Sequence, residues 1–191
     1  MSKDKPRPIR LDNSGLKIAI VCARYNQDLT DALLDQTVKA LFAGGILKSN
    51  IQVVRVPGSN EIPYAAASLA ELREVHSIIA LGVVIAGATH HHLAIGESTA
   101  HAIQKVAVDY SVPVINGIIV VDDRRHAEER ITGSLRRGEE YAQAALEMAA
   151  LCSHFDERLR QLEEQELKRQ QSEMFDYGTD EDDDADYWKK S

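Results

Sequence analysis

The residues best suited to chemistry lie at 82–92, in the stretch GVVIAGATHHH. A β-branched run leads into this stretch and a segment with helical periodicity follows it, which is typical of the carboxyl end of a buried parallel strand. Glycines and a helix N-terminus offer backbone N–H groups to an anion, and imidazoles exchange protons near neutral pH. The stretch therefore predicts an anion site beside a proton-transferring group. A plain strand-to-helix connection with solvated histidines is the alternative interpretation.

Length and composition predict a single domain with one hydrophobic core. The chain has 191 residues, of which 44% are hydrophobic, enough for one core. Its first six residues are polar, and the longest apolar run, at 78–88, is too short to span a bilayer. Cys22 and Cys152 fit no metal or disulfide spacing and are expected to be buried thiols. We therefore expect a cytoplasmic protein without a membrane partner.

The net charge of −8 is concentrated at the end of the chain. Residues 1–150 carry 17 acidic and 16 basic side chains, whereas residues 151–191 carry 13 acidic and 6 basic ones. Neither part has the basic stripe that a nucleic-acid-binding protein needs, so no nucleic-acid partner is expected. The acidity is a property of the tail.

Apolar periodicity predicts strands that alternate with helices. The expected strands cover 17–23, 51–56, 76–84 and 112–121. The expected helices cover 28–43, 64–74, 92–109, 124–131 and 139–154. This alternation predicts an α/β fold, a three-layer α/β/α sandwich around a four-stranded parallel sheet.

The ends of the chain are expected to lie outside this domain, which we place at residues 15–155. Residues 1–14 carry two prolines and predict an extended N-terminal arm. Residues 156–175 are rich in Glu, Gln, Arg and Lys, which predicts a charged helical extension. Residues 176–191 contain seven acidic residues up to Asp186 and predict an acidic, disordered tail.

Several short motifs follow the expected strands in order. They are RYN at 24–26, PGSNEIP at 57–63, GVVIAGATHH at 82–91, STAH at 98–101, PVINGI at 113–118 and AEER at 127–130. In this order and spacing the set resembles the 6,7-dimethyl-8-ribityllumazine synthase family of riboflavin biosynthesis, over roughly residues 15–155. The resemblance implies a flavodoxin-like fold and a transferase activity. That activity is condensation of 5-amino-6-(D-ribitylamino)uracil with 3,4-dihydroxy-2-butanone 4-phosphate, giving 6,7-dimethyl-8-ribityllumazine, phosphate and water.

The resemblance also implies a role for each matching residue. His91 matches the family's proton-transferring histidine, and Tyr25 matches the aromatic that stacks on the pyrimidine. Other positions implied for pyrimidine and ribityl binding are Asn26, Ser59, Asn60, Glu61, Val83, Val84, Ile85, Asn116 and Arg137. The implied phosphate site consists of Gly87, Ala88, Thr89 and Arg130. His90 and His92 stand where other residues are usual, and three adjacent histidines cannot all reach one ion without loop strain, so no metal site is predicted.

Three departures from the family pattern keep a second interpretation open. Asn60 and Asn116 each stand where an aromatic residue is usual, and Ala86 replaces a commonly charged residue. Losing two aromatic contacts removes apolar area from a pocket, at a cost on the order of 1 kcal/mol each. A non-catalytic flavin- or pterin-binding protein, or a structural shell protein of the same fold, is therefore the alternative. A flavodoxin-like phosphate-binding domain outside the family is a third.

The implied reaction requires two substrates held together and a proton shuttle, with no metal or redox cofactor. The expected partners are accordingly these small-molecule substrates and other copies of the chain. In the family the site lies between neighbouring subunits of a pentamer, and some members form an icosahedral shell of sixty subunits. Riboflavin synthase, which consumes the product, is a further partner suggested by the resemblance.

Overall fold

The computed structural model of the chain describes residues 13–89 and 91–177. Its strands are β1 (Ile18–Ala23), β2 (Ile51–Val56), β3 (Ser77–Ile85) and β4 (Val114–Val121). Its helices are α1 (Gln27–Ala43), α2 (Ile62–Glu71), α3 (His91–Tyr110), α4 (Arg124–Ile131) and α5 (Arg137–Tyr177), with short 3-10 helices η1 (Lys48–Asn50) and η2 (Ser59–Glu61). The predicted alternation of strands and helices is confirmed.

All four strands are parallel, in the spatial order β2-β1-β3-β4. The two central strands are almost entirely buried, which explains why they appear in the sequence as continuous apolar runs. β4 begins at Val114, two residues later than expected, because Pro113 has no N–H to donate to a strand ladder. Its carbonyl still accepts a hydrogen bond from the Ile78 backbone N–H at 2.8 Å.

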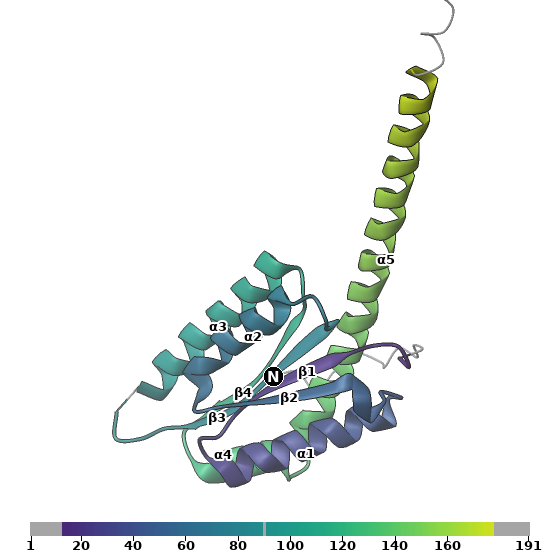
Figure 1. Cartoon of the computed structure of the whole chain (residues 1–191). Helices are drawn as coiled ribbons and strands as arrows, with labels where there is room; N and C mark the ends of the chain where they lie inside the picture. The colour runs from purple at the N-terminus through teal and green to yellow at the C-terminus, as the bar shows by residue number, and fades with distance from the viewer. Residues whose placement is uncertain (1–12, 90, 178–191) are drawn as a thin grey trace, which may run out of the picture. The chain divides into compact units, whose positions relative to one another are not determined.

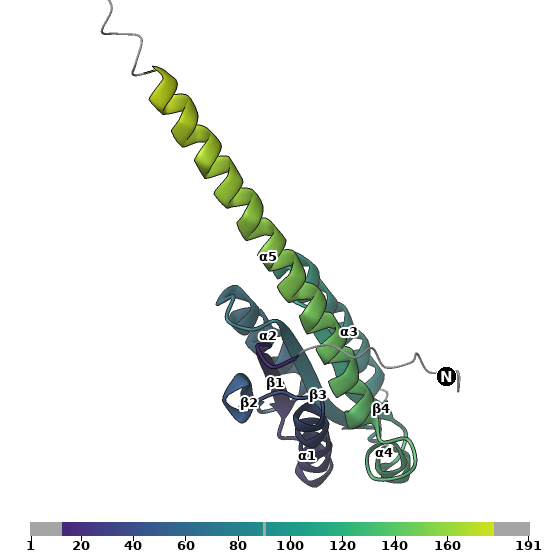
Figure 2. The same ribbon diagram turned by 90° about the vertical axis from the view of Figure 1, so that its right-hand side faces the viewer.

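Side chains that alternate along β1 divide the core into two halves. Ile18, Ile20 and Cys22 face a cluster formed with α1, α4 and the first part of α5. Ala19, Val21 and Ala23 face a second cluster formed with α2 and α3. Figures 1 and 2 show α2 and α3 on one side of the sheet, with α1 and α4 on the other. The predicted three-layer sandwich is confirmed, and burial raises the pKa of the Cys22 thiol to about 11.

α5 runs as one continuous helix through the last predicted core helix, 139–154, and through 156–175, where a charged extension of that helix was expected. The chain forms two compact units that meet at Ser153 and His154 within this helix. Up to Cys152 the helix contributes buried residues to the core, for example Ala145 and Leu146. From His154 to Glu173 every side chain is exposed. Of the predicted tail, residues 176–177 belong to α5 and the rest lies outside the described residues.

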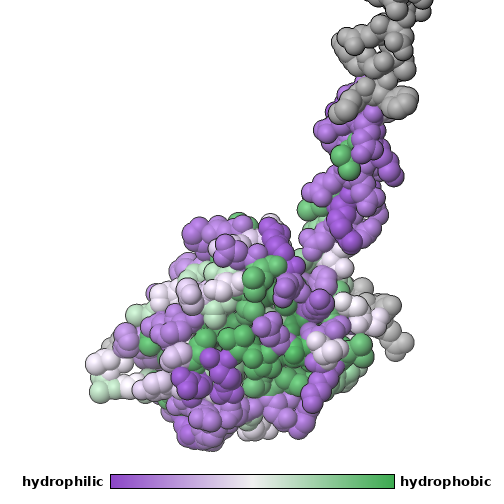
Figure 3. All heavy atoms as spheres, in the orientation of Figure 1, coloured by the Kyte–Doolittle hydropathy of each residue, from purple (hydrophilic) through white to green (hydrophobic). Residues whose placement is uncertain are grey.

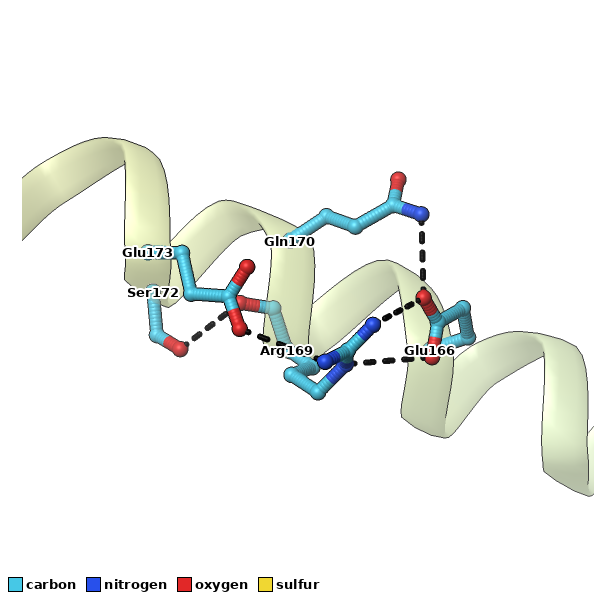
Figure 4. A network of polar contacts seen from close by, with 5 residues as sticks. All are labelled: Glu166, Arg169, Gln170, Ser172 and Glu173. Atoms are coloured by element: carbon cyan, nitrogen blue, oxygen red, sulfur yellow. Dashed lines mark hydrogen bonds and ion pairs between the residues drawn. The ribbon is translucent and has the colours of Figure 1, made fainter.

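The second part of α5 buries no side chains, and ion pairs along the helix stabilise it instead. Figure 4 shows Arg169 between two carboxylates, with Nη2 lying 2.7 Å from Glu166 and Nη1 lying 3.4 Å from Glu173. Gln170 also donates to Glu166, at 3.1 Å. The Arg169 hydrogen bond lowers the pKa of the Glu166 carboxyl. Such pairs at helical spacing stabilise a solvated helix by a few tenths of a kcal/mol each.

The surface of the domain includes an apolar area. Figure 3 shows hydrophobic residues gathered in the middle of one face, over the strands, with hydrophilic residues around them. The edge strand β2 exposes Val53 to 42%. No helix within 13–89 or 91–177 has the length and apolarity needed to cross a membrane. Of the predicted N-terminal arm, only Asn13 and Ser14 are described, and Asn13 Nδ2 donates to the Gly44 carbonyl at 2.8 Å.

Candidate active site

A cavity of about 800 Å³ opens where the carboxyl ends of β1 and β3 meet the turn after β2. The lining residues come from the end of β3 and from the segments that follow each of the four strands. They are Tyr25, Asn26, Pro57, Gly58, Ser59, Asn60, Glu61, Val83, Val84, Ile85, Ala86, Gly87, Thr89, His91, His92, Ile95 and Arg124. Ligands of open α/β sheets bind at this edge, because helix N-termini and strand ends converge there.

The connection after β1 supplies an aromatic ring and a carboxamide. Asn26 has a left-handed backbone (φ 52°), which asparagine tolerates better than most residues. Its Nδ2 donates to the Val83 carbonyl at 2.9 Å, so the connection is tied to the neighbouring strand β3. Tyr25 is 76% exposed at the cavity, with its backbone N–H donating to the Pro57 carbonyl at 3.2 Å. An exposed ring in this position can stack on a flat heteroaromatic ligand.

Each side chain of η2 contacts a different partner. Ser59 is buried against Gly82, where an added Cβ would lie 2.5 Å from the serine Oγ. Asn60 Oδ1 lies 3.5 Å from the hydroxyl of Thr99, a buried residue of α3. Glu61 Oε2 accepts from the Gly58 N–H at 2.7 Å. The turn thus presents a hydroxyl, a carboxamide and a carboxylate at one wall of the cavity.

The connection between β3 and α3 brings the predicted anion site and His91 to the same cavity. Gly87, Thr89 and His91 line it, whereas Ala88 does not. His91 is exposed in the first turn of α3, and His92 is 8% exposed with its Nε2 lying 3.8 Å from Asp122 Oδ1. Helix α3 directs the positive end of its dipole toward this connection. Sequence reasoning set His92 aside, although it also lines the cavity.

Arg124 also lines the cavity, and sequence reasoning did not single it out. It opens α4, whose N-cap Asp123 accepts from the His126 N–H at 2.9 Å. Its guanidinium donates from Nε to Glu128 Oε1 at 2.8 Å and from an Nη to the Asp28 carboxylate. The hydrogen bond from Arg124 lowers the pKa of Asp28, and the two carboxylates raise the pKa of Arg124. Its place three residues after a strand end was the signal available in the sequence.

Besides Ala88, three more predicted site residues lie outside this cavity. Asn116 is exposed on β4, where its Oδ1 accepts from the Ile118 N–H at 3.0 Å. Arg130 donates from Nη1 to the His126 carbonyl at 3.0 Å, and Arg137 forms an ion pair with Glu140. Gln36 fixes the α4–α5 connection between them, accepting from the Gly138 N–H at 2.7 Å and donating to the Ile131 carbonyl at 2.9 Å. A single chain therefore does not assemble the full predicted set.

Comparison with known proteins identifies the family. The family model described as 6,7-dimethyl-8-ribityllumazine synthase matches residues 15–153. The chain belongs to this family. A lumazine synthase from Stenotrophomonas maltophilia strain R551-3 is 41% identical over 136 residues, covering 71% of this chain and 88% of the relative.

Two further lumazine synthases, from distant organisms, show the same extent of similarity. The protein of Nitrosomonas europaea is 37% identical over 147 residues, covering 77% of this chain and 88% of its own length. That of Thermococcus kodakarensis is 39% identical over 144 residues, covering 75% of this chain and 91% of its own length. All the cavity residues lie within the part that matches the lumazine synthase model, whereas residues 154–191 lie beyond it.

Proposed function

We propose that the chain condenses 5-amino-6-(D-ribitylamino)uracil with 3,4-dihydroxy-2-butanone 4-phosphate to form 6,7-dimethyl-8-ribityllumazine, releasing phosphate and water. The observation that carries this proposal is the convergence of Tyr25, Glu61 and His91 on one cavity, within the segment that matches the family. An aromatic face, a carboxylate and an imidazole are the groups that a polar heteroaromatic substrate and a proton transfer require.

The pyrimidine and its ribityl chain are assigned to the wall formed by Tyr25, the η2 turn and β3. Tyr25 would stack on the ring, while strand residues 83–85 offer backbone groups and apolar side chains. The polar side chains of this wall are Asn26, Ser59, Asn60 and Glu61. A hydrogen-bonding wall of this kind rejects analogues that lack the matching polar groups. His91 lies beside it and would transfer the proton that imine formation and ring closure require.

The phosphate group is assigned to residues 87–89 at the start of α3. Backbone N–H groups and the positive end of a helix dipole favour a dianion there. Arg130 would add a guanidinium, which pairs with phosphate in a bidentate manner. Because Arg130 does not line the cavity of its own chain, a neighbouring copy would supply it, together with Asn116 and Arg137.

This division of residues supports a ring of subunits. We propose a pentamer in which each site combines two chains, with a sixty-subunit shell as a further level of assembly. The exposed apolar area over the strands and the exposed Val53 of β2 support an interaction between copies, because large apolar patches mark contact surfaces. The proposed location is the cytoplasm, where riboflavin synthase would consume the product.

Residues 15–155 form the proposed catalytic domain, with 156–175 as an extension and 176–191 as a tail. The test of the function is to incubate the full chain with both substrates and follow lumazine fluorescence together with phosphate release. Equal amounts of the two products, and none when either substrate is omitted, are the expected result. Flavin or pterin binding without product formation would instead favour the non-catalytic alternative.

A further inference from the structure

We propose that Arg124 is a phosphate-binding residue of the substrate cavity, contributed by the same chain that contributes His91. This inference rests on the proposed function, since it names the phosphate of the four-carbon substrate as the ligand. It adds to the phosphate site a residue that neither the sequence motifs nor the match to the family indicated. Among the described residues that line the cavity, Arg124 is the only lysine or arginine.

The position of Arg124 relative to the phosphate loop follows from contacts at the end of β4. The Val121 carbonyl accepts from the Ala86 N–H at 2.9 Å, at the start of the connection that carries Gly87 and Thr89. Asp122 lies 3.8 Å from His92, in the first turn of α3. Arg124 comes directly after these contacts and lines the same cavity as residues 87 and 89. A dianion held by the start of α3 therefore has this guanidinium on the neighbouring wall.

The guanidinium is accessible and has donors to offer. The Arg124 side chain is 54% exposed. Within the described part of the chain, its bonds to Asp28 and Glu128 use two of the five N–H donors of a guanidinium. These carboxylates hold the group in place but also offset its charge. A phosphate dianion would compete with them for the same cation, and a bidentate contact would favour the phosphate.

The competing interpretation is that Arg124 only links α1 to α4. Its two partners are themselves well exposed, at 62% for Asp28 and 48% for Glu128. Ion pairs of this kind contribute little to stability, because water and salt screen them. The two interpretations also make opposite predictions for removing the carboxylates. If Arg124 binds phosphate, the double variant Asp28→Asn/Glu128→Gln leaves its guanidinium more available, and phosphate binding is kept or strengthened. If Arg124 only links α1 to α4, the double variant breaks that link, and phosphate binding weakens as it does in Arg124→Gln.

The experiment measures inorganic phosphate binding to the full-length assembled protein by isothermal titration calorimetry, at fixed salt. Arg124→Gln should weaken phosphate binding about tenfold, as expected for one charge-assisted contact. The matched control Arg125→Gln removes an adjacent exposed arginine of α4 that does not line the cavity, and should bind as the wild type does. The double variant Asp28→Asn/Glu128→Gln should bind phosphate at least as tightly as the wild type.

Two outcomes would overturn the inference. One is that Arg124→Gln and Arg125→Gln bind phosphate equally well. The other is that the double variant weakens binding as much as Arg124→Gln does, which would assign Arg124 a structural role. Circular dichroism and the particle mass of each variant would ensure that folded, assembled proteins are compared.

Kinetics then separate this inference from the proposed function. Arg124→Gln should raise the KM for the four-carbon phosphate about tenfold and leave the KM for the pyrimidine within about twofold. An active enzyme with both KM values unchanged would contradict the inference while the function stands. A protein that forms no lumazine, yet loses phosphate binding in Arg124→Gln, would contradict the function while the phosphate site stands.

Discussion

The proposed site residues occupy two regions of the chain that differ in how complete they are. At the carboxyl edge of the parallel sheet, Tyr25, Glu61 and His91 line one cavity together with most of the other predicted residues. On the outer part of β4 and around the α4–α5 connection, Asn116, Arg130 and Arg137 do not line it. Their side chains are nevertheless held in place by hydrogen bonds or an ion pair within the chain.

This difference is the basis of our proposal that the two regions serve different copies of the molecule. The first region is a cavity that lacks the predicted cationic residues Arg130 and Arg137. The second region is a set of positioned polar side chains that do not line that cavity. In the proposed head-to-tail ring, the second region of one subunit would contribute to the site formed by the first region of the next. Variants in either region test this comparison. Their expected effects on rate and KM differ in size and in the substrate that is affected.

The largest effect is expected at His91. His91→Ala should leave the fold intact and slow condensation by roughly ten- to a thousandfold, because it removes the proposed proton-transferring group. Single-turnover formation of lumazine measures this effect. The matched control is His101→Ala, an exposed histidine of the same helix that does not line the cavity. Equal rates for the two variants would remove His91 from the mechanism.

Arg130 in the second region should come next. Arg130→Ala is expected to raise the KM for the phosphate substrate about tenfold or more, with a much smaller change for the pyrimidine, because guanidinium–phosphate pairing concerns one substrate. Inorganic phosphate should compete with the phosphate substrate less well in this variant than in the wild type. Equal changes in both KM values would point to a structural role, through the bond that Arg130 donates to His126.

A smaller effect is expected from filling the space beside Ser59. In Gly82→Ala the new methyl group would meet the serine Oγ at 2.5 Å, and the flexible hydroxyl would have to turn away. We expect a several-fold higher KM for the pyrimidine and little loss of stability, since this contact is with the end of a side chain. Gly15→Ala, where an added Cβ meets nothing within 4 Å, is the control for stability measurements. A change in the KM for the phosphate substrate alone would contradict the assignment of Ser59 to the pyrimidine subsite.

The smallest effect is expected outside both regions. Truncation after Met174 removes all seven acidic residues of the tail, which cannot pack into a core, and should change neither assembly nor rate. Size-exclusion chromatography with light scattering, followed by the activity assay, would test this. A truncated chain that fails to assemble would show that the tail contributes to an interface.

The sequence predicted the sheet well because strand formation here depends on local pattern. β-branched runs gave all four strands, and the only notable shift, at the start of β4, comes from the missing N–H of Pro113. The second part of α5 was expected from its charged composition, since it buries nothing and depends on pairs such as Arg169 with Glu166. Periodicity of apolar residues carries no information about such a segment.

The cavity was predictable only where motifs follow strand ends. Arg124 was missed because it lies in none of the recognised motifs, and only the pairing of β4 with β3 brings it to the cavity. The opposite problem affects Arg130. Its motif is recognisable in the sequence, but Arg130 does not line the substrate cavity of its own chain. No pattern within one chain shows where a neighbouring copy will lie.

Co-assembly of two inactive variants tests the central claim, a site shared between neighbouring chains, most directly. Chains with His91→Ala and chains with Arg130→Ala would be co-expressed in equal amounts and purified as mixed assemblies. About one quarter of the interfaces in a random head-to-tail ring would combine an intact half from each variant. Lumazine formation should therefore recover to about a quarter of the wild-type rate at low phosphate-substrate concentration. Mixed assemblies no more active than the better parent would contradict the account.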